Sequence, residues 1–158
     1  MIMPMKKYLL ILATALMTLC TVSCDKDEES IDKKDLYGMW LQTEVLYDGE
    51  LLNNIPNTTM VINDDGTGSS TVVFGNSDNH TTEFKWSVKG KTIKYEDTAY
   101  YTNGVLDTDI TDFSKIQMTV KKLTSDKLVV TYKDEFDEEK HNVQVTFERV
   151  PEILEVLD

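Results

Sequence analysis

Cysteine is nearly absent from this sequence, which limits how the chain can be crosslinked or bind metal. The chain has 158 residues and two cysteines, Cys20 and Cys24, both near its beginning. No cysteine follows, so the rest of the chain can form neither an internal disulfide nor a zinc site built on thiolates. A content of 41% hydrophobic and 28% charged residues is ordinary for a globular protein, and the length predicts one domain.

Basic residues are also few. Lysine and arginine together number 16, against 28 aspartate and glutamate residues, so the formal net charge is −12. Binding to a nucleic-acid backbone depends on basic side chains that neutralise phosphates. A strongly acidic surface instead repels nucleic acid and anionic lipid. The composition therefore excludes a nucleic-acid-binding function.

Long apolar runs are missing except for one near the start, and that one is too short to span a membrane. Lys6 and Lys7 precede a nearly unbroken apolar stretch over 8–22, which is 15 residues. A spanning helix needs roughly 20 apolar residues, whereas a short run behind positive charges is typical of a cleaved signal peptide. We expect residues 1–23 to be removed, which leaves no transmembrane helix and lowers the net charge from −12 to −14.

The end of this stretch, Thr21-Val22-Ser23-Cys24, resembles the lipobox of bacterial lipoproteins, in which small residues precede a cysteine that is lipidated. The resemblance implies cleavage before Cys24 and several acyl chains on it, which hold a protein on a membrane at about 0.8 kcal/mol per buried methylene. The family prefers leucine where this chain has Thr21, so ordinary signal-peptidase cleavage is an alternative. Cys20 is a poorer lipidation site, because the bulky Leu19 stands before it. The two cysteines could also form a disulfide or serve only as apolar residues of the signal helix.

Residues 24–34 are predicted to form a tether between the lipidated cysteine and the domain. The run over 25–30, Asp-Lys-Asp-Glu-Glu-Ser, has no apolar residue to bury, which is typical of a solvated linker. It resembles the acidic signal that sends lipoproteins of certain Gram-negative lineages to the outer face of the outer membrane. The resemblance implies an exported protein anchored to the outer membrane at the cell surface. If the run is only a spacer, the leaflet stays open.

From Asp35 onward, apolar and polar residues alternate with the period of half-buried strands. In the clearest segment, Phe84, Trp86 and Val88 alternate with polar residues. Turn residues such as Asn103-Gly104 separate the segments and predict hairpins. We predict strands near 37–47, 58–63, 68–74, 81–88, 91–96, 98–102 or 108–113, 115–123, 127–133 and 140–149.

So many consecutive hairpins leave open sheet edges unless the sheet closes on itself. The predicted fold is therefore all-β: an antiparallel up-and-down β-barrel or rolled meander of about eight strands. The domain is expected over 35–150, followed by a C-terminal tail over 151–158.

Several motifs resemble those of lipocalins and of lipocalin-like domains in bacterial lipoproteins, a calycin-type barrel. Gly38 and Trp40 match the family's Gly-x-Trp opening, and the segments 84–90 and 116–130 resemble its middle strand and late hairpin. The resemblance implies a barrel whose bottom is closed by Trp40, with a ligand site at the open end. The chain departs from the family in being short and in lacking its Thr-Asp-Tyr motif and C-terminal helix.

Aromatic residues of the predicted strands are candidates for lining an apolar pocket, because ligand sites are concave and mostly apolar. The alternative is that they pack into a filled core, since a small eight-stranded barrel can be filled by its own side chains. The candidate ligand-binding residues are Tyr47, Phe74, Trp86, Tyr95, Phe113, Tyr132 and Phe147.

Metal-binding and catalytic patterns are weak. The two histidines, His80 and His141, stand in polar or charged surroundings and are expected to be solvated. The acidic residues Asp107, Asp109 and Asp112, and the run 134–139, match no calcium-loop spacing and predict an acidic rim. No nucleophile stands beside a base, and no phosphate-binding glycine loop is present. We therefore predict no metal, no cofactor and no enzyme activity.

Two functions remain open. The first is a membrane-tethered lipocalin-like protein that binds a small apolar or amphipathic molecule, or part of a glycan, at the open end of the barrel. The second is a non-catalytic interaction module with a filled barrel that docks onto another envelope protein. The first needs an apolar cavity, whereas the second needs a packed interior and an exposed contact patch.

Overall fold

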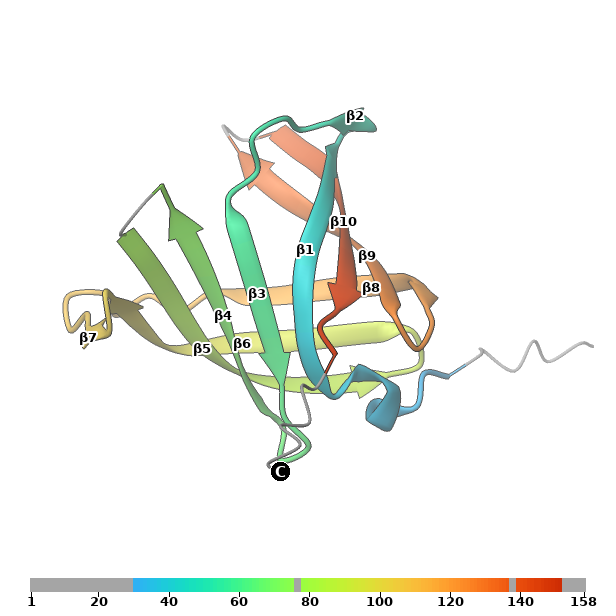
Figure 1. The fold of residues 1–158 in the computed structure, drawn as a ribbon, viewed down its shortest axis with the longest axis horizontal. Helices are drawn as coiled ribbons and strands as arrows, with labels where there is room; N and C mark the ends of the chain where they lie inside the picture. Colours follow the sequence, from blue (N-terminus) through green and yellow to red (C-terminus); the bar gives the residue numbers. More distant parts are fainter. Residues whose placement is uncertain (1–29, 76–77, 137–138, 152–158) are drawn as a thin grey trace, which may run out of the picture.

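The computed structural model describes residues 30–75, 78–136 and 139–151 (Figure 1). Within these residues, one short 3-10 helix, η1 (Lys33–Leu36), precedes ten strands. The strands are β1 (Gly38–Tyr47), β2 (Glu50–Leu51), β3 (Asn57–Ile62), β4 (Thr67–Phe74), β5 (Asp78–Lys89), β6 (Thr92–Thr102), β7 (Val105–Leu106), β8 (Lys115–Leu123), β9 (Lys127–Phe136) and β10 (Glu139–Arg149). Among the described residues, none forms a helix that is long and apolar enough to cross a membrane. The predicted signal peptide, Cys24, residues 25–29 of the tether and residues 152–158 of the tail lie outside this part of the chain.

Eight long strands form a closed antiparallel barrel. Neighbouring strands follow the order β1-β3-β4-β5-β6-β8-β9-β10, and β10 returns to pair with β1. The closing ladder runs from the pair Trp40–Arg149 to the pair Tyr47–Val143. β2 and β7 are two-residue additions that pair with β1 and β6. The prediction of an all-β antiparallel barrel of about eight strands is therefore confirmed.

The sequence allowed two alternative strands between residues 97 and 114, and the structure decides between them. The predicted segments 91–96 and 98–102 belong to one strand, β6, which continues through a bulge opposite Glu83 and Phe84. The alternative strand over 108–113 does not form, and those residues lie in the irregular connection between β7 and β8. One inserted residue lets a long strand absorb a break in its alternation without ending, because a bulge leaves that residue unpaired.

The two ends of the barrel differ. We call the end that holds η1 and the turns β3–β4, β5–β6 and β8–β9 the closed end. There, the amide of Ile31 donates a 3.1 Å hydrogen bond to the carbonyl of Gly90, which fixes the segment before η1 against the β5–β6 turn. The opposite end, where β1, β4, β6 and β9 finish, we call the open end. Figure 1 shows the long strands spreading apart toward it.

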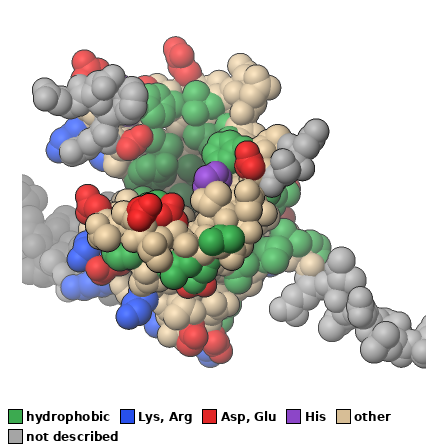
Figure 2. Space-filling view, turned by 90° about the vertical axis from the view of Figure 1, so that its left-hand side faces the viewer, with side chains coloured by type: hydrophobic (Ala, Val, Ile, Leu, Met, Phe, Trp, Pro, Cys, Tyr) green, Lys and Arg blue, Asp and Glu red, His purple; other side chains and the backbone are tan. Residues whose placement is uncertain are grey.

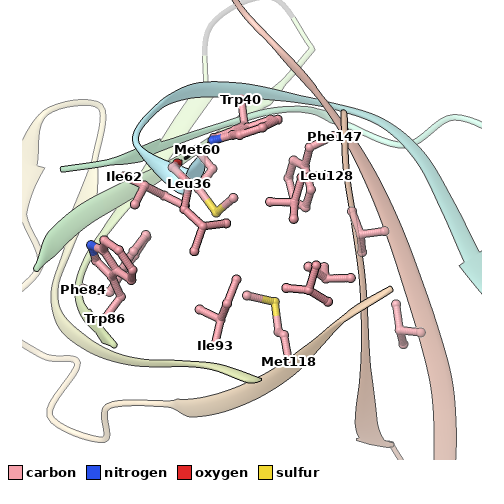
Figure 3. Packing of buried hydrophobic residues seen from close by; sticks show 14 of the residues in the cluster. Leu36, Trp40, Met60, Ile62, Phe84, Trp86, Ile93, Met118, Leu128 and Phe147 are labelled. Atoms are coloured by element: carbon pink, nitrogen blue, oxygen red, sulfur yellow. Dashed lines mark hydrogen bonds between the residues drawn. The ribbon is translucent and has the colours of Figure 1, made fainter. Parts of the chain in front are cut away.

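Most of the hydrophobic core lies in the closed half of the barrel, and Val143, which pairs with Tyr132, extends it beyond that half. Leu36, Trp40, Leu128 and Val130 are fully buried, with 0% exposure. Figure 3 shows labelled core side chains from opposite walls, such as Trp40 and Met118, converging on the interior. Burial of a leucine or valine contributes about 1.5–3 kcal/mol each, so this half carries most of the hydrophobic stabilisation. The other core residues are Val45, Met60, Ile62, Phe84, Trp86, Ile93, Met118, Val120, Val143, Val145 and Phe147.

Trp40 and Gly38, the residues expected to close the barrel, lie at the closed end. The indole Nε1 of Trp40 donates a 2.8 Å hydrogen bond to the carbonyl of Leu36, and the Arg149 guanidinium lies 4.1 Å from the indole centroid. Arg149 also donates to the carbonyls of Tyr37, Asp35 and Ser125, which ties η1, β10 and the β8–β9 turn together. Gly38 has a φ of +116°, and a Cβ there would stand 2.9 Å from the Arg149 guanidinium. A glycine at this position lets the arginine approach the backbone closely.

Gly68 on β4 allows a second close approach. Its missing side chain leaves room for the ring of Phe84 on β5, because a Cβ at Gly68 would stand 2.4 Å from Phe84 Cε2 and 2.6 Å from the carbonyl oxygen of Val61. The Phe84 ring can therefore lie flat against β4 on the inner face, about half way between the two ends of the barrel. This ring forms the floor of the open half.

Candidate ligand site in the open half of the barrel

Strand alternation determines which side chains face the interior. On β6, Ile93 belongs to the core, and Tyr95 and Asp97 follow on the same face. On β9, Leu128 and Val130 belong to the core, and Tyr132 follows on the same face. Because successive side chains on a strand point to opposite faces, the inner face changes from aliphatic to aromatic and polar toward the open end. We call this region the open half.

The open half is hollow on one side because β8 and β9 separate. They pair only from Thr119 to Leu123 on β8, opposite 128–131 on β9, whereas β9 and β10 stay paired up to Phe136. A groove of about 880 Å³ lies where the two strands part. Its inner side is lined by Ile116, Tyr132 and Asp134, and its outer side by polar residues that include Lys115, Lys121 and Lys133. Figure 2 shows this side of the molecule, with a hollow that is lined by hydrophobic side chains and rimmed in part by acidic ones. Eight-stranded barrels can hold one small ligand when side chains leave space.

Small polar side chains on β4 and β5 keep the interior open. Ser70 pairs with Thr82, and Thr82 pairs with Tyr100, all on the inner face. Gly68 and Phe84 form the next pair on this face toward the closed end. A serine and a threonine fill much less volume than the phenylalanine and tryptophan that β5 supplies to the core. The inner wall formed by β4 and β5 therefore carries small side chains at this height.

The bulge in β6 brings Asp97 and Tyr100 together on the inner face. Asp97 pairs with Phe84, and Ala99 pairs with Glu83, so Thr98 is the extra residue. The shift turns Tyr100 inward, and its hydroxyl donates a 2.5 Å hydrogen bond to Asp97 Oδ2. The ring of Tyr100 also stacks on Phe113, with the centroids 5.8 Å apart and the planes at 8°. The two residues form a polar group against the aromatic wall.

The carboxyl group of Asp97 is buried and only partly satisfied. Its residue exposure is 7%, and its amide is used by a 2.9 Å hydrogen bond to the Ser114 carbonyl. Oδ1 has no hydrogen-bond partner among the described residues. A buried oxygen without a donor is costly, and such atoms in native structures require an explanation.

The pKa values of the tyrosines of this wall reflect burial and the carboxylates around them. Burial raises the pKa of Tyr95, and the nearby negative charge of Asp97 raises it further. Burial also raises the pKa of Tyr132, with Asp134 as the next cause, and that of Tyr100, with its bond to Asp97 as the next cause. These hydroxyls stay neutral at physiological pH and can both donate and accept hydrogen bonds.

At the end of β1, a histidine and an aspartate join the rim to β10. His141 Nδ1 lies 2.7 Å from Asp48 Oδ2, and the amide of Asn142 donates a 2.7 Å bond to Asp48 Oδ1. His141 stacks on Tyr47 with ring centroids 4.7 Å apart. These bonds lower the pKa of Asp48, the His141 bond first. The expectation of a fully solvated His141 is therefore wrong, because half-burial against Tyr47 and pairing with Asp48 hold it in place. His80 is exposed, as expected.

The aromatic candidates from the sequence fall into three groups. Tyr47, Tyr95 and Tyr132 are half-buried on the inner face. Phe74 and Phe113 are more exposed at the open end, with 51% and 39% exposure. Trp86 and Phe147 belong to the packed core, and the Trp86 indole donates to the carbonyls of Asn63 and Thr67 in the β3–β4 turn. The structure thus brings together part of the predicted set, and places its other members at the rim or in the core.

The rim of the open end is apolar. Exposed large hydrophobic residues occur in β2 and the residue after it, at the end of β4, in β7 and in the connection to β8. We call this set the apolar rim: Leu51, Leu52, Val73, Phe74, Val105, Leu106, Ile110 and Phe113. Contiguous exposed apolar surface marks a ligand mouth or a docking surface.

No group of three or more metal-ligating side chains occurs among residues 30–75, 78–136 and 139–151. Asp107, Asp109 and Asp112 lie in the connection between β7 and β8, where Asp107 Oδ1 accepts from the amide of Asp109 in a local turn. Side chains over 135–138 lie outside the described part of the chain.

Sequence reasoning missed Asp97 and Tyr100. A signal for Asp97 was present, because it continues the apolar phase of Ile93 and Tyr95 while Lys94 and Glu96 occupy the other face. Tyr100 gave no such signal, since unbroken alternation from Asp97 would place Ala99 and Tyr101 inside. Only the bulge reverses that order.

Comparison with solved structures shows that the barrel has a lipocalin-like fold. The chain is similar to the crystal structure of a lipocalin-like protein from Bacteroides uniformis, with a TM-score of 0.52 and 16% sequence identity over 73% of this chain and 99% of that one. No protein-family model matches the sequence, and comparison with curated proteins gives no significant match. The fold is therefore lipocalin-like, as the Gly-x-Trp opening predicted.

Proposed function

We propose that this protein is a membrane-tethered, lipocalin-like binding protein whose open half holds one small amphipathic molecule, an apolar compound with a polar group or a glycan fragment. The observation that carries the proposal is the change of the inner face from a filled core to a hollow with an aromatic and polar wall. Ligand sites combine mostly apolar walls with few placed polar groups. Asp97, Tyr100, Tyr95 and Tyr132 supply such groups.

The proposed setting is the outer membrane of a bacterium, with the barrel held by acyl chains on Cys24 through the acidic segment over 25–34. The support is the lipobox-like sequence and the apolar run before it. The proposed role is non-catalytic, without cofactor or nucleic acid. The intact mass of the full chain purified from its own kind of bacterium tests the anchor. Acyl chains on Cys24 that disappear in the variant C24A support it, and an unmodified N-terminus contradicts it.

Binding is tested on the mature chain, residues 24–158, with the neutral fluorescent probe N-phenyl-1-naphthylamine. We expect saturable fluorescence enhancement, because the probe is apolar and of a size for one small pocket. Thr82 faces the hollow, so Thr82→Trp should fill it and abolish the enhancement. Thr81 is the matched control, since it lies next to Thr82 on the outer face and pairs with Thr71 there. Equal binding by the variants T82W and T81W would contradict the proposal.

Native mass spectrometry of the gently purified protein complements the probe. A discrete adduct that is lost on denaturation supports the pocket and reveals the ligand class. A clean mass of the free protein, repeated after incubation with lipid and glycan mixtures, argues against it.

The apolar rim favours a second candidate, an interaction module that docks onto another envelope protein. Val105 and Leu106 of β7 are 70% and 51% exposed, so both apolar side chains are open to contact with a partner. Replacing both with aspartate separates the two functions. The doubly substituted chain should still bind the probe if the hollow is the site, whereas a docking module should lose its partner in a crosslinking experiment on whole cells.

A further inference from the structure

Among the described residues, the inner face of the open half carries aspartates and two histidines but no lysine or arginine. Asp78, Asp97 and Asp134 lie in the inward phase of β5, β6 and β9, as judged from the core residues of the same strands. In the described residues of these strands and of β8 and β10, the lysines lie in the outward phase, as Lys115 does where it pairs with Glu96 at 3.0 Å. Arg149 faces the interior only at the closed end, where backbone carbonyls hold it.

Asp97 is the acid that lies deepest. It pairs with Phe84 at the floor of the open half, and one of its carboxyl oxygens is held by Tyr100 while the other has no partner among the described residues. A carboxylate in such a position is stabilised by a donor or a positive charge that enters the pocket. The histidines near the mouth do not fill this role, because His141 is held by Asp48, and His80 lies at the exposed rim where its ring contacts Phe74.

The chemistry around Asp97 fits an organic cation better than a metal ion. One carboxylate and one tyrosine hydroxyl are too few ligands for calcium, which takes six to eight oxygens. Aromatic residues are its neighbours instead, since Phe84 pairs with Asp97 and Tyr100 donates to it, and these rings contact Tyr95 and Phe113. Aromatic faces attract ammonium groups, and their bodies accept an apolar tail. The acidic surface of the chain, with a formal net charge of −12, raises the local concentration of cations in the same direction.

We propose that the hollow selects amphipathic molecules with a protonated amine, whose N–H groups donate to Asp97 Oδ1 while the apolar body lies against the aromatic wall. The proposal rests on the proposed function, that the open half binds a small molecule, and it adds the chemical class of the head group.

The experiment compares three probes with the same tail: octylamine, 1-octanol and octanoate. Each displaces N-phenyl-1-naphthylamine from the mature chain at pH 7, where octylamine is a cation and octanoate an anion. We expect octylamine to bind at least about tenfold more tightly than octanol, because a charge-assisted hydrogen bond in a buried site exceeds a neutral one by about the free energy of a tenfold change in affinity. Octanoate should bind most weakly.

Two nearly isosteric variants assign the preference to one residue. Asp97→Asn should weaken octylamine binding about tenfold or more and leave octanol binding within about twofold. Glu96→Gln is the matched control: it removes the same charge from the neighbouring position on the outer face, and it should leave both affinities unchanged. Tyr100→Phe should keep the amine preference, since the hydroxyl bonds the other carboxyl oxygen.

The outcomes separate the two proposals. Displacement by octanol with no advantage for octylamine, or an advantage that survives D97N, overturns the amine proposal and leaves the binding pocket standing. Failure of N-phenyl-1-naphthylamine and of all three probes to bind a chain that unfolds cooperatively overturns both. The comparison of head groups on the unmodified chain does not depend on whether a variant folds.

Discussion

The two halves of this barrel are made by the same strands but have opposite interiors. In the closed half, Trp40, Leu128 and Val130 have 0% exposure and belong to one hydrophobic core. In the open half, the barrel strands supply Tyr132 and a buried Asp97, one of whose carboxyl oxygens has no partner among the described residues. A strand of about ten residues can thus stabilise the fold with one end and line a pocket with the other. Substitutions in the two halves should therefore affect different properties.

The largest loss in the free energy of unfolding is expected from a substitution in the closed half. Trp40→Ala removes a fully buried indole, its hydrogen bond to Leu36 and the surface on which Arg149 lies. Truncation of a buried tryptophan costs about 3–5 kcal/mol. Urea unfolding followed by circular dichroism measures the loss. The open-half counterpart, Phe113→Ala, should cost no more than the stacking contact with Tyr100, about 0.5–1.5 kcal/mol. Equal losses would mean that the two halves are not distinct.

The next effect is expected at the boundary between the halves. Gly68→Ala would place a methyl group 2.6 Å from the carbonyl oxygen of Val61 and 2.4 Å from the Phe84 ring. The backbone atom cannot move away freely, so we expect a loss of about 1–3 kcal/mol from overpacking. Gly104→Ala is an unsuitable control, because Gly104 has a φ of +78°, whereas Ser69→Ala on the same strand is suitable. A Gly68→Ala variant as stable as the unmodified chain would show that Phe84 can move, and that the floor of the pocket is adjustable.

A smaller effect should appear in alkali, through the wall of the open half. Burial raises the pKa of Tyr95 above its ordinary value of 10.0. The folded state then keeps a proton that the unfolded state loses, so the stabilisation is complete below pH 10 and is lost as the pH rises through the folded pKa. The free energy of unfolding should fall less steeply above pH 10 in Tyr95→Phe than in the unmodified chain. Tyr101→Phe, on the outer face, should change the slope less.

The smallest effect is expected at the rim, from Asp48. Its pKa is lowered below 3.8 by the bond to His141 and by the amide of Asn142. A lowered pKa stabilises the fold above the unfolded value, and the stabilisation is lost as the pH falls through the folded pKa. The melting temperature of Asp48→Asn should therefore lie slightly below that of the unmodified chain at neutral pH, and the difference should disappear below pH 3.8. Asp109→Asn serves as a control in the β7–β8 connection. A difference that persists in acid would contradict the role of the carboxylate.

The fold was predictable from the sequence because alternation and turn residues act locally. The segment with Phe84, Trp86 and Val88 reads as a half-buried strand without any knowledge of its partners. Closure followed from the number of hairpins, since open edges are avoided. The Gly38 and Trp40 motif predicted that the barrel is lipocalin-like, and the structural likeness confirms this fold.

The candidate site was less predictable because it depends on register. Aromatic residues on buried faces look alike in sequence, whether they enter the core as Phe147 does or line the open half as Tyr132 does. Whether an aromatic residue enters the core or lines the open half depends on its position along the barrel axis. That position is set by the pairing register between strands that are distant in sequence. The separation of β8 from β9, which opens the hollow, is likewise a property of pairing and leaves no local signal.

The bulge at Thr98 determines which side chains of β6 face the interior of the open half, and it does not affect those of the closed half. If Thr98 were paired in regular alternation instead of bulged, β6 would present Ala99 and Tyr101 inward in place of Tyr100 and Thr102, while Ile93 and Tyr95 would keep their positions. Loss of the bulge at unchanged chain length would thus exchange the hydroxyl that bonds Asp97 for a methyl group and leave the closed half as it is. Such a barrel can acquire a new specificity through a change of register in one half of a strand, without any substitution in the closed half.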